Sequence, residues 1–286
     1  MTIAKIVVPV NGSEHDELAI EAAIQFGRPF NSHVKVLYVY PDPTRAIPVV
    51  GAPLSGEVVT AIVEGQSRTA QSAAKRAHEA LSRICDRYHV PILKEPKRQA
   101  SVTCSFHPAM GNLEYLVAQE AALSDLVVFG SLRWHDNTEL NETFLKTLRT
   151  ALRPVLLVNQ TPIGNFRNVA ICWDGSLHAA HAVSASLPFL VQSTSVDLLT
   201  VSRGKQCNVD TSEVLEFLAL HGVKVHVETV ESALPIGKAL LEAARNCGCN
   251  LIVLGGFGHS PVLETILGGV TDYIASHSKI PILMSH

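Results

Sequence analysis

The chain contains two related copies of one sequence pattern, and this internal repeat constrains its fold more than any other feature. The stretch KIVVPVNGSEHDELAIEAAIQF near the start resembles NVAICWDGSLHAAHAVSASLPF in the middle, which places Gly12 opposite Gly175. Later landmarks also match, SDLVVFGS with CNLIVLGG and RPVLLVNQ with IPILMSH. A repeat on this scale indicates two copies of one domain in tandem.

The two copies differ in length. The offset between matching residues falls from 163 at the first landmark to 125 at Gly130 and Gly255, so the second copy lacks 38 residues. The first copy has the loop PDPTRAIPVVGAPLSG and a helical stretch over 57–88, where the second has only TSEVLEFLALHG. Pro162 and Gly164 interrupt both periodicities, so we place the boundary in NQTPIGNF, between domains at 1–160 and 166–286.

Within each copy, strand-like and helix-like segments alternate. Short runs rich in β-branched residues, typical of buried parallel strands, lie in the first copy at 5–10, 34–40, 91–97, 126–130 and 154–158. Between them, i, i+3, i+4 spacing predicts helices, for example at 14–27 and 111–122. This alternation predicts an α/β fold of two tandem doubly wound domains, each a five-stranded parallel sheet flanked by helices.

The composition indicates a globular protein without a cluster of basic residues for binding nucleic acid. The 286 residues are 47% apolar and 17% charged, which is enough apolar material for buried cores. The net charge is −3 and like charges do not cluster, so we expect no nucleic acid partner. No apolar run approaches the ~18 residues of a membrane span, and MTIAKIVVPV is too short for a signal sequence. Six scattered cysteines fit a reducing compartment, so we expect a cytoplasmic protein.

Glycines follow the fourth strand of the second copy in two groups. The residues concerned are Gly255 and Gly258, then Gly268, Gly269, Val270 and Thr271 before the helical segment DYIASHS. In a doubly wound sheet, ligands bind at the carboxyl ends of the strands, and unpaired amides at a helix start favour an anion. A polyphosphate held between the two groups is one interpretation. Glycines that only form turns are the other.

The pattern Gly255-x-x-Gly258, nine residues, then Gly268 resembles the nucleotide-binding signature of the universal stress protein family. The likeness extends over the whole chain, because WDGSLHAA is similar to the family's Asp-Gly-Ser turn after strand one and both halves follow its five-strand order. Some members of the family bind ATP and others do not. One residue departs from the signature: Gly269 stands where Ser or Thr is usual, and Thr271 is a second source of a hydroxyl.

The resemblance implies a nucleotide site in the second half. It places Asp174 against the adenosine part and the backbone of Val201 against adenine, with ATP or a related adenine nucleotide as the ligand and Mg²⁺ as its companion. From the residues themselves, His259 is the histidine that we expect beside phosphate. An alternative remains open for the first turn, in which Asp174 or Ser176 caps the helix that follows.

The first copy lacks this signature. The positions that match Gly258, Gly268 and Gly269 hold Arg133, Thr143 and Phe144. Asn11 also stands where the second copy has Asp174. We therefore expect nucleotide in the second half alone, with the first half as a structural or regulatory relative.

Other groups of reactive side chains give weaker signals. Cys247-x-Cys249 lies in the turn before a strand and could be half of a zinc site. No second ligand pair follows it, which counts against a metal there, but the alternative stays open. We place Cys104 and His107 in a loop, where a thiol and imidazole could pair, without an orienting acid or oxyanion hole. His178 and His181 are expected to lie on one helix face rather than to bind metal.

These patterns favour a stress-response protein that binds adenine nucleotide as a sensor or regulator and is not a fast enzyme, with slow ATP hydrolysis left open. The alternative is a structural or interaction protein whose pocket holds another small molecule or nothing. The last strands of the two copies, PVLLV and PILMS, would be exposed edges unless paired. We expect them to pair with each other, so that the halves associate about an approximate two-fold axis, and further homodimerisation stays open.

Overall fold

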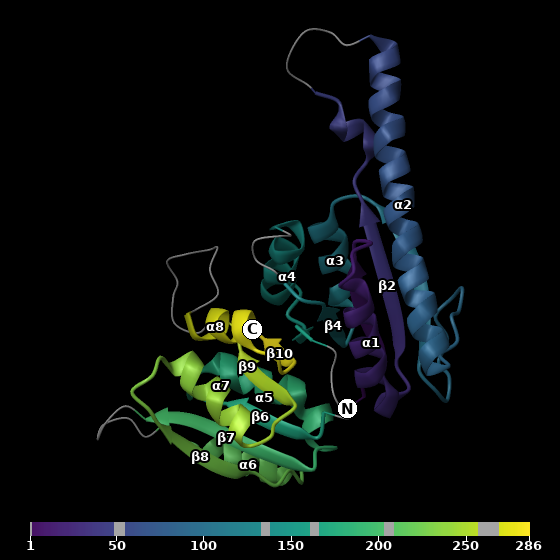
Figure 1. The fold of residues 1–286 in the computed structure, drawn as a ribbon. Helices are drawn as coiled ribbons and strands as arrows, with labels where there is room; N and C mark the ends of the chain where they lie inside the picture. Colours follow the sequence, from purple (N-terminus) through teal and green to yellow (C-terminus); the bar gives the residue numbers. More distant parts are fainter. Residues whose placement is uncertain (1, 49–54, 133–137, 161–165, 203–208, 257–268) are drawn as a thin grey trace.

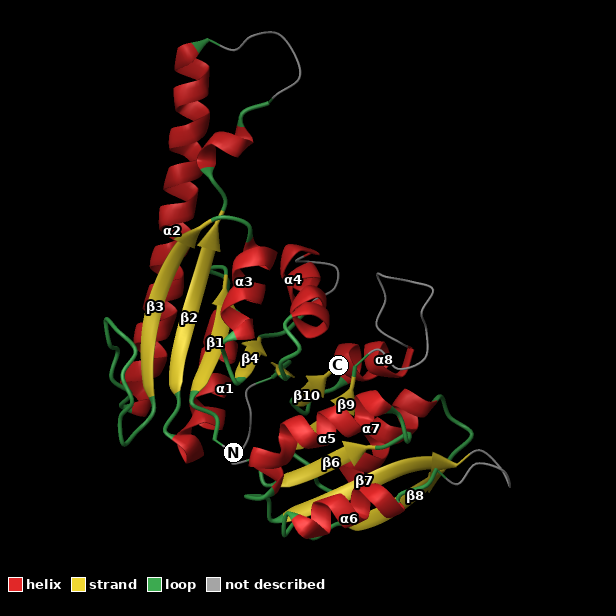
Figure 2. Cartoon of the chain, turned by 180° about the vertical axis from the view of Figure 1, so that it is seen from behind, coloured by secondary structure: helices red, strands yellow, loops and turns green. Residues whose placement is uncertain are grey.

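A computed structural model describes residues 2–48, 55–132, 138–160, 166–202, 209–256 and 269–286. The strands of this described chain form one sheet in the order β3-β2-β1-β4-β5-β10-β9-β6-β7-β8 (Figures 1 and 2). Their bounds are β1 Lys5–Val10, β2 His33–Tyr40, β3 Thr103–Met110, β4 Leu126–Phe129, β5 Val155–Leu157, β6 Asn168–Cys172, β7 Ser195–Ser202, β8 His226–Glu231, β9 Leu251–Gly255 and β10 Ile282–Ser285.

Within each half, the neighbouring strands are parallel. The predicted α/β fold of two doubly wound, five-stranded parallel sheets is therefore confirmed. The predicted domain boundary at 161–165 lies outside the described residues.

Helices cover both faces of the sheet. On one face, residues of α1, α2, α5 and α6 pack into one core, and on the other, residues of α3, α4, α7 and α8 pack into a second. The helix bounds are α1 Asp16–Gly27, α2 Gly56–Tyr88, α3 Leu113–Ala122, α4 Thr138–Thr150, α5 Leu177–Leu190, α6 Ser212–Leu220, α7 Ile236–Asn246 and α8 Gly269–His277, with short 3-10 turns at η1 Arg28–Phe30 and η2 Pro43–Ala46. No helix in the described ranges is long and apolar enough to cross a membrane.

The two half-sheets meet at β5 and β10, which pair antiparallel. In this register Leu156 lies opposite Leu283, its own equivalent in the repeat, and Leu157 lies opposite Ile282. Equivalent residues that face each other are the mark of a two-fold relation, so the pseudo-two-fold axis passes between Leu156 and Leu283.

Aromatic rings continue this contact between the halves. Phe26 of α1 and Phe189 of α5 are repeat equivalents, and their ring centroids lie 5.4 Å apart at 72°. The ring centroids of Phe166 and Phe26 lie 3.6 Å apart with the rings tilted by 33°, and Phe30 meets Phe189 edge-on at 5.3 Å. From the first half, the side-chain amide of Asn159 also donates to two carbonyls at the end of α8, at 2.8 and 3.0 Å.

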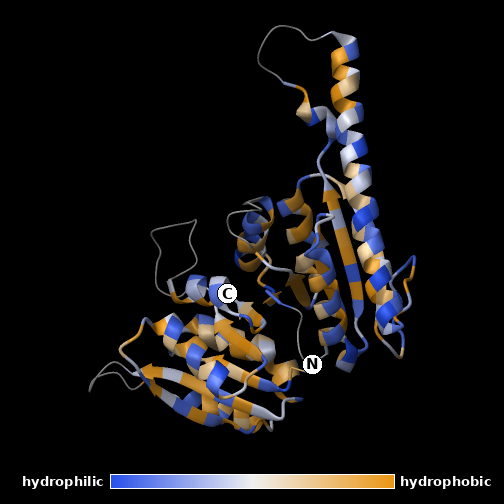
Figure 3. Ribbon diagram, in the orientation of Figure 1, coloured by the Kyte–Doolittle hydropathy of each residue, from blue (hydrophilic) through white to orange (hydrophobic). Residues whose placement is uncertain are grey.

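Helix α2 makes the first half larger than the second. Its C-terminal part is packed into the core through residues such as Ala77, Leu81 and Ile84. Its N-terminal part stands away from the sheet (Figures 1 and 2) and carries both apolar and polar residues (Figure 3), with Val58 44% exposed. This projection accounts for much of the difference in length between the copies.

One predicted strand was wrong. Residues 91–97 make only an isolated bridge between Ile92 and Cys104, and the third strand of the first half is β3 at 103–110 instead. Pro108 is tolerated there because β3 is the edge of the sheet and one flank of an edge strand needs no donor. Its polar residues hid it in the sequence, because their partners come from β2: His33 contacts Thr103 and Ser105, both at 2.8 Å.

Candidate functional site

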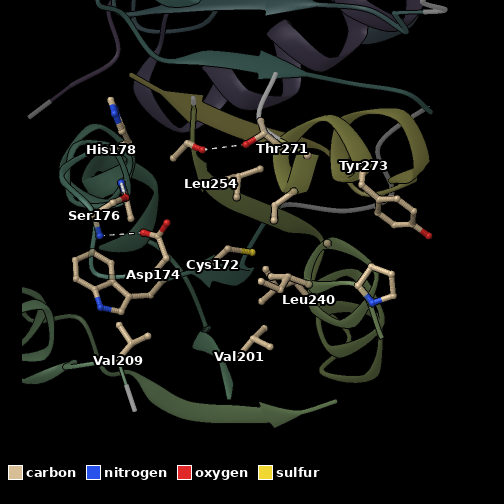
Figure 4. Close-up of a pocket in the computed structure, with 18 residues that line it drawn as sticks. Cys172, Asp174, Ser176, His178, Val201, Val209, Leu240, Leu254, Thr271 and Tyr273 are labelled. Atoms are coloured by element: carbon tan, nitrogen blue, oxygen red, sulfur yellow. Dashed lines mark hydrogen bonds between the residues drawn. The ribbon is translucent and has the colours of Figure 1, made fainter. Parts of the chain in front are cut away.

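A pocket of about 610 Å³ lies in the second half, at the carboxyl ends of β6, β7 and β9 (Figure 4). The turn after β6 and the starts of α5, α7 and α8 complete its walls. Its size falls in the usual range for small-molecule sites, roughly 300–1,000 Å³. The structure brings together here six of the nine predicted site residues, namely Asp174, Val201, Gly255, Gly269, Val270 and Thr271. The other three, Gly258, His259 and Gly268, lie outside the described residues.

The turn after β6 presents Asp174 at the pocket. Gly175 has a φ of +77°, a left-handed conformation that glycine adopts without strain, and it lets the chain turn sharply into α5. Asp174 Oδ1 accepts the amide of Ser176 at 2.9 Å, while Ser176 Oγ caps α5 by accepting the amide of Ala179 at 3.1 Å. The N-cap is therefore Ser176. Asp174 is exposed rather than buried, so its carboxylate lies where a ligand can reach it.

Apolar side chains form the wall of the pocket on the side away from α8. In Figure 4 the side chains of Val201, Val209 and Leu240 lie below Asp174, on the side away from α8. Trp173 Nε1 donates to the carbonyl of Asp210 at 3.0 Å, and this bond fixes the segment that carries Val209. The sequence did not single out these apolar residues, because nothing in their type or spacing separates a pocket wall from an ordinary core.

Cys172 lies at the inner end of the pocket, between Asp174 and Leu240 (Figure 4). Burial, together with the smaller effect of the Asp174 charge, raises the pKa of its thiol to about 12. The thiol is therefore protonated at neutral pH and acts as a small, weakly polar side chain.

The start of α8 forms the upper wall. A Cβ added to Gly269 would meet no other atom within 4 Å, and the residue is not in the left-handed region. The first amides of an α-helix have no partner within the helix, and its dipole favours an anion there. Thr271 is 5% exposed, and its hydroxyl donates to the carbonyl of Gly255 at 3.4 Å. While that bond lasts, this hydroxyl proton is not available to a phosphate.

Gly255 is required by the packing of the protein itself. A Cβ there would lie 2.7 Å from the backbone nitrogen of Ala179 at the start of α5. Its repeat equivalent Gly130 shows the same constraint, with a Cβ 2.9 Å from the carbonyl oxygen of His15. Gly255 lines the pocket, but both halves need a glycine at this position for packing. Its presence is therefore not evidence that the second half binds a ligand.

A histidine stack lies beside the pocket. His178, from the first turn of α5, stacks on His286 with ring centroids 4.6 Å apart, and His286 Nδ1 lies 3.3 Å from the carbonyl of Gly256. His178 and His181 both lie on α5, three residues apart, and His178 lines the pocket while His181 is exposed. A Cβ on Gly256 would meet Leu148 of α4 at 3.1 Å, so the first half packs against this end of the site.

The cysteines outside the pocket do not form the sites considered from the sequence. Cys104 and His107 belong to β3, where residues three apart point to opposite faces, so the thiol–imidazole pair considered as a weak alternative does not form. Cys247 donates to Glu228 at 2.9 Å and Cys249 contacts Asp197 at 3.8 Å. Burial raises the pKa of both these thiols to about 12. Among the described residues no group of three or more His, Cys, Asp or Glu side chains is arranged to hold a metal ion.

The equivalent place in the first half is filled by the protein's own groups. The amide of Gly12 donates to the Asp16 carboxylate at 2.8 Å, and the amide of Asn11 donates to it at 3.2 Å. Arg76 Nε of α2 donates to the carbonyl of Gly12 at 2.9 Å. A Cβ on Gly12 would lie 2.6 Å from the carbonyl oxygen of Ala73, so the backbone of α2 covers the turn.

Comparisons with known proteins agree with this repeated architecture. A sequence model of the Universal stress protein family matches residues 2–159 and 173–286. A universal stress protein from Archaeoglobus fulgidus has a similar structure, with a TM-score of 0.63 and 17% identity over 98% of this chain and 95% of that one. A functionally unknown protein from Pseudomonas aeruginosa has a TM-score of 0.57 and 14% identity over 99% of this chain and 92% of that one. These likenesses show the fold. No similar sequence was found among curated proteins.

Proposed function

This chain belongs to the universal stress protein family as a tandem member, and we propose that its second half binds ATP or a related adenine nucleotide. We propose further that the protein acts as a sensor or regulator in the stress response and not as a fast enzyme. The observation that carries the proposal is the pocket of about 610 Å³, which gathers the turn at Asp174, the end of β7 at Val201 and the start of α8 around one space.

The pocket's chemistry suits the parts of an adenine nucleotide in order. The apolar side chains of Val201 and Val209 suit the flat face of adenine, and the exposed carboxylate of Asp174 suits the ribose hydroxyls. The first amides of α8, from Gly269 onward, have no partner within the helix and suit phosphate. In this proposal Val270 and Thr271 support the helix start, and Gly258, His259 and Gly268 approach the phosphates.

Magnesium enters the proposal through the nucleotide. Among the described residues no set of three ligands could hold the ion by itself, and Mg²⁺ commonly keeps several waters and binds through substrate phosphates. We therefore assign it to the phosphate oxygens, and this chain's part is to position those phosphates at α8.

The domain arrangement belongs to the same proposal. Two domains at 1–160 and 166–286, joined through β5 and β10, would form a pseudo-symmetric pair within one chain. Support comes from the antiparallel register at Leu156 and Leu283 and from the contact of Phe26 with Phe189.

Binding is tested directly with the full chain. Native mass spectrometry of freshly purified protein should detect a bound adenine nucleotide, or show one after addition of ATP, at one molecule per chain. Calorimetric titration with ATP in the presence and absence of Mg²⁺ then gives the affinity and stoichiometry. Two equal ATP sites per chain would contradict the proposal. Failure of the protein to bind ATP after any endogenous ligand has been removed would also contradict it.

A second candidate is an apolar metabolite, favoured by the mainly aliphatic inner wall that includes Ile236, Leu240 and Leu254. Such a ligand would leave the amides at α8 unused and would not compete with inorganic phosphate. The mass of the ligand released by denaturing the purified protein distinguishes the two candidates.

A further inference from the structure

The side chain of Asn159 connects the first half to the helix that begins at the pocket of the second half. Asn159 follows β5, and its side-chain amide donates to the carbonyls of Ala275 and Ser278 at 2.8 and 3.0 Å. Ala275 is in the last turn of α8, and Ser278 is the first residue after that helix. Residues 269–271, at the other end of α8, line the pocket. A residue of the first half therefore binds the far end of the helix to which we assign phosphate.

Helix α8 is short and depends on such contacts. It has nine residues, whereas isolated helices of fewer than about 12–15 residues are marginal in water. The last carbonyls of a helix have no partner within it, and Asn159 supplies a donor to that of Ala275. The second half contributes a bond from Arg245 to the carbonyl of His277, which is long at 3.4 Å. The shorter contacts at this end come from the first half.

Apolar packing also holds α8 against the first half. Ile274 and Ala275 of α8 are almost completely buried, and they belong to the same core as Phe144 and Leu148 of α4. Leu148 lies close to Gly256, the residue that follows β9. The first half therefore contacts both α8 and the end of β9, two elements that form the pocket.

The contact of Asn159 is not repeated symmetrically. The residue that the repeat places opposite Asn159 is His286, which follows β10. Its ring stacks on that of His178 beside the pocket, and its Nδ1 lies 3.3 Å from the carbonyl of Gly256. The residues after both central strands therefore contact elements around the pocket of the second half.

We propose that Asn159 is a positioning residue for the phosphate end of the nucleotide site, so that the second half needs the first half in order to hold phosphate. This inference rests on the proposed function and adds to it the part that the first half plays. The amides at the start of α8 keep their arrangement only while the helix is formed, and the bonds at its last turn oppose its unwinding. Apparent affinity falls with the fraction of molecules in the binding-competent state, so loss of Asn159 weakens the binding of phosphate.

Calorimetric titration of the full chain with ATP and with adenosine tests the proposal. In Asn159→Ala the affinity for ATP should fall by about fivefold to tenfold, the effect of one or two hydrogen bonds. The affinity for adenosine should stay the same, because adenosine has no phosphate to place at α8. Asn159→Gln keeps the amide donor and should recover part of the ATP affinity.

Arg153→Ala is the matched control. Arg153 is also in the first half and donates to the last carbonyl of a helix, that of Ala122 in α3, at 3.0 Å, but it does not line the pocket. Its replacement should leave both affinities unchanged. Unchanged ATP affinity in Asn159→Ala, or an equal loss of ATP and adenosine affinity, would overturn the inference and leave the proposed function standing. A wild-type chain that binds no ATP would overturn both.

Hydrogen exchange of the ligand-free protein tests the positioning of α8 without any nucleotide. Peptides that cover α8 should exchange faster in Asn159→Ala than in the wild type, and at the wild-type rate in Arg153→Ala. Circular dichroism checks that each variant is folded, and Asn159→Leu, which has a similar volume, replaces the alanine variant if that one is not. Unchanged exchange in α8 after loss of Asn159 would also overturn the inference.

Discussion

The two halves of this protein share one fold, yet they differ in what occupies the end of the first strand. In the first half the amides after β1 are held by Asp16, and the backbone of α2 lies over the turn at Gly12. In the second half Ala179 takes the place of Asp16, the short helix α6 stands in place of α2, and a pocket of about 610 Å³ opens. The presence of a pocket is therefore decided largely by which helix covers the turn.

A second comparison concerns equivalent glycines of the two halves. Gly12 and Gly175 both have positive φ, at 80° and 77°, and Gly130 and Gly255 both lie against the start of a helix. Each pair serves the fold in both halves, so these glycines alone do not indicate a ligand. What differs between the halves is the carboxylate at Asp174 and the residues after β9.

The largest effect is expected from weakening the symmetric contact between the two halves. Phe26→Ala removes a ring that is 1% exposed and 3.6 Å from that of Phe166, so we expect a loss of about 3–5 kcal/mol in the free energy of unfolding. Phe189→Ala should cost a similar amount if the two equivalent rings play equivalent parts. Chemical denaturation measures both values.

Phe217→Ala provides the control, since this half-buried ring contacts His221 within its own half. It should cost clearly less than Phe26→Ala. Equal costs for all three variants would show that the contact between the halves has no special weight.

A smaller effect should follow from the buried carboxylate that distinguishes the first half. Burial raises the pKa of Asp16 to about 6, against the lowering effect of two backbone amides and Arg76. In the unfolded chain an aspartate has a pKa of about 3.9, so the native state holds the proton more tightly. Its contribution to stability is complete below about pH 4 and is lost as pH rises through about 6.

Asp16→Asn removes this contribution. Relative to the variant, the wild-type free energy of unfolding should fall by about 2 kcal/mol between pH 4 and pH 7, since one pKa unit corresponds to about 1.4 kcal/mol and the unfolded aspartate is already about half ionised at pH 4. Urea denaturation at four pH values across this range measures the difference. Parallel pH profiles for the two proteins would mean that Asp16 is ionised in the fold at the same pH as in the unfolded chain.

Much of the fold could be predicted from the sequence, because the repeat and its periodicities are local signals. The strand at β3 could not, since its apolar face at Cys104 alternates with the polar residues Thr103 and Ser105, whose partner is His33 of β2, and with His107, whose ring contacts Ser105. Polar residues that are satisfied by other elements do not look like a buried strand. The expectation of a loop at Cys104 and His107 failed for the same reason.

Part of the candidate site could be predicted from the sequence. Asp174 and Gly255 stand at landmarks that the repeat aligns, so their approach to each other follows from the topology. Cys172, Val209 and Leu240 also line the pocket, yet their position depends on how α6 and α7 pack. The closure of the first half through Arg76 and Ala73 was equally hidden, because it depends on where α2 crosses the turn.

Exchange of one residue between the turns after β1 and β6 tests whether the carboxylate of Asp174 contributes to binding. Asn11 Oδ1 accepts the amide of Ser13 at 3.1 Å, just as Asp174 Oδ1 accepts the amide of Ser176 at 2.9 Å. Asp174→Asn therefore keeps the turn and removes the charge. We expect ATP affinity to fall by about 1.5–3 kcal/mol, the usual value of a hydrogen bond to a charged group.

The matched change Asn11→Asp should leave the affinity and the stoichiometry of ATP unchanged, because α2 still covers that turn. Calorimetric titration of both variants measures the two effects. A second site gained in Asn11→Asp would show that charge, and not the covering helix, is what keeps nucleotide from the first half.

The smallest effect concerns Gly269, where this chain departs from the family signature. Gly269 begins α8 with open space around its Cβ position and without a positive φ, so serine fits there without strain. If main-chain amides already hold the phosphate, Gly269→Ser adds one hydroxyl and should strengthen ATP binding by about 0.5–1.5 kcal/mol, a severalfold gain. Thr271→Val is the control, and it should leave the affinity unchanged because the Thr271 hydroxyl is directed at Gly255. Calorimetry on the two variants compares them directly. A loss of binding in Thr271→Val with no gain in Gly269→Ser would mean that Thr271 already supplies the hydroxyl of the signature, and that its bond to Gly255 yields to phosphate when the nucleotide binds.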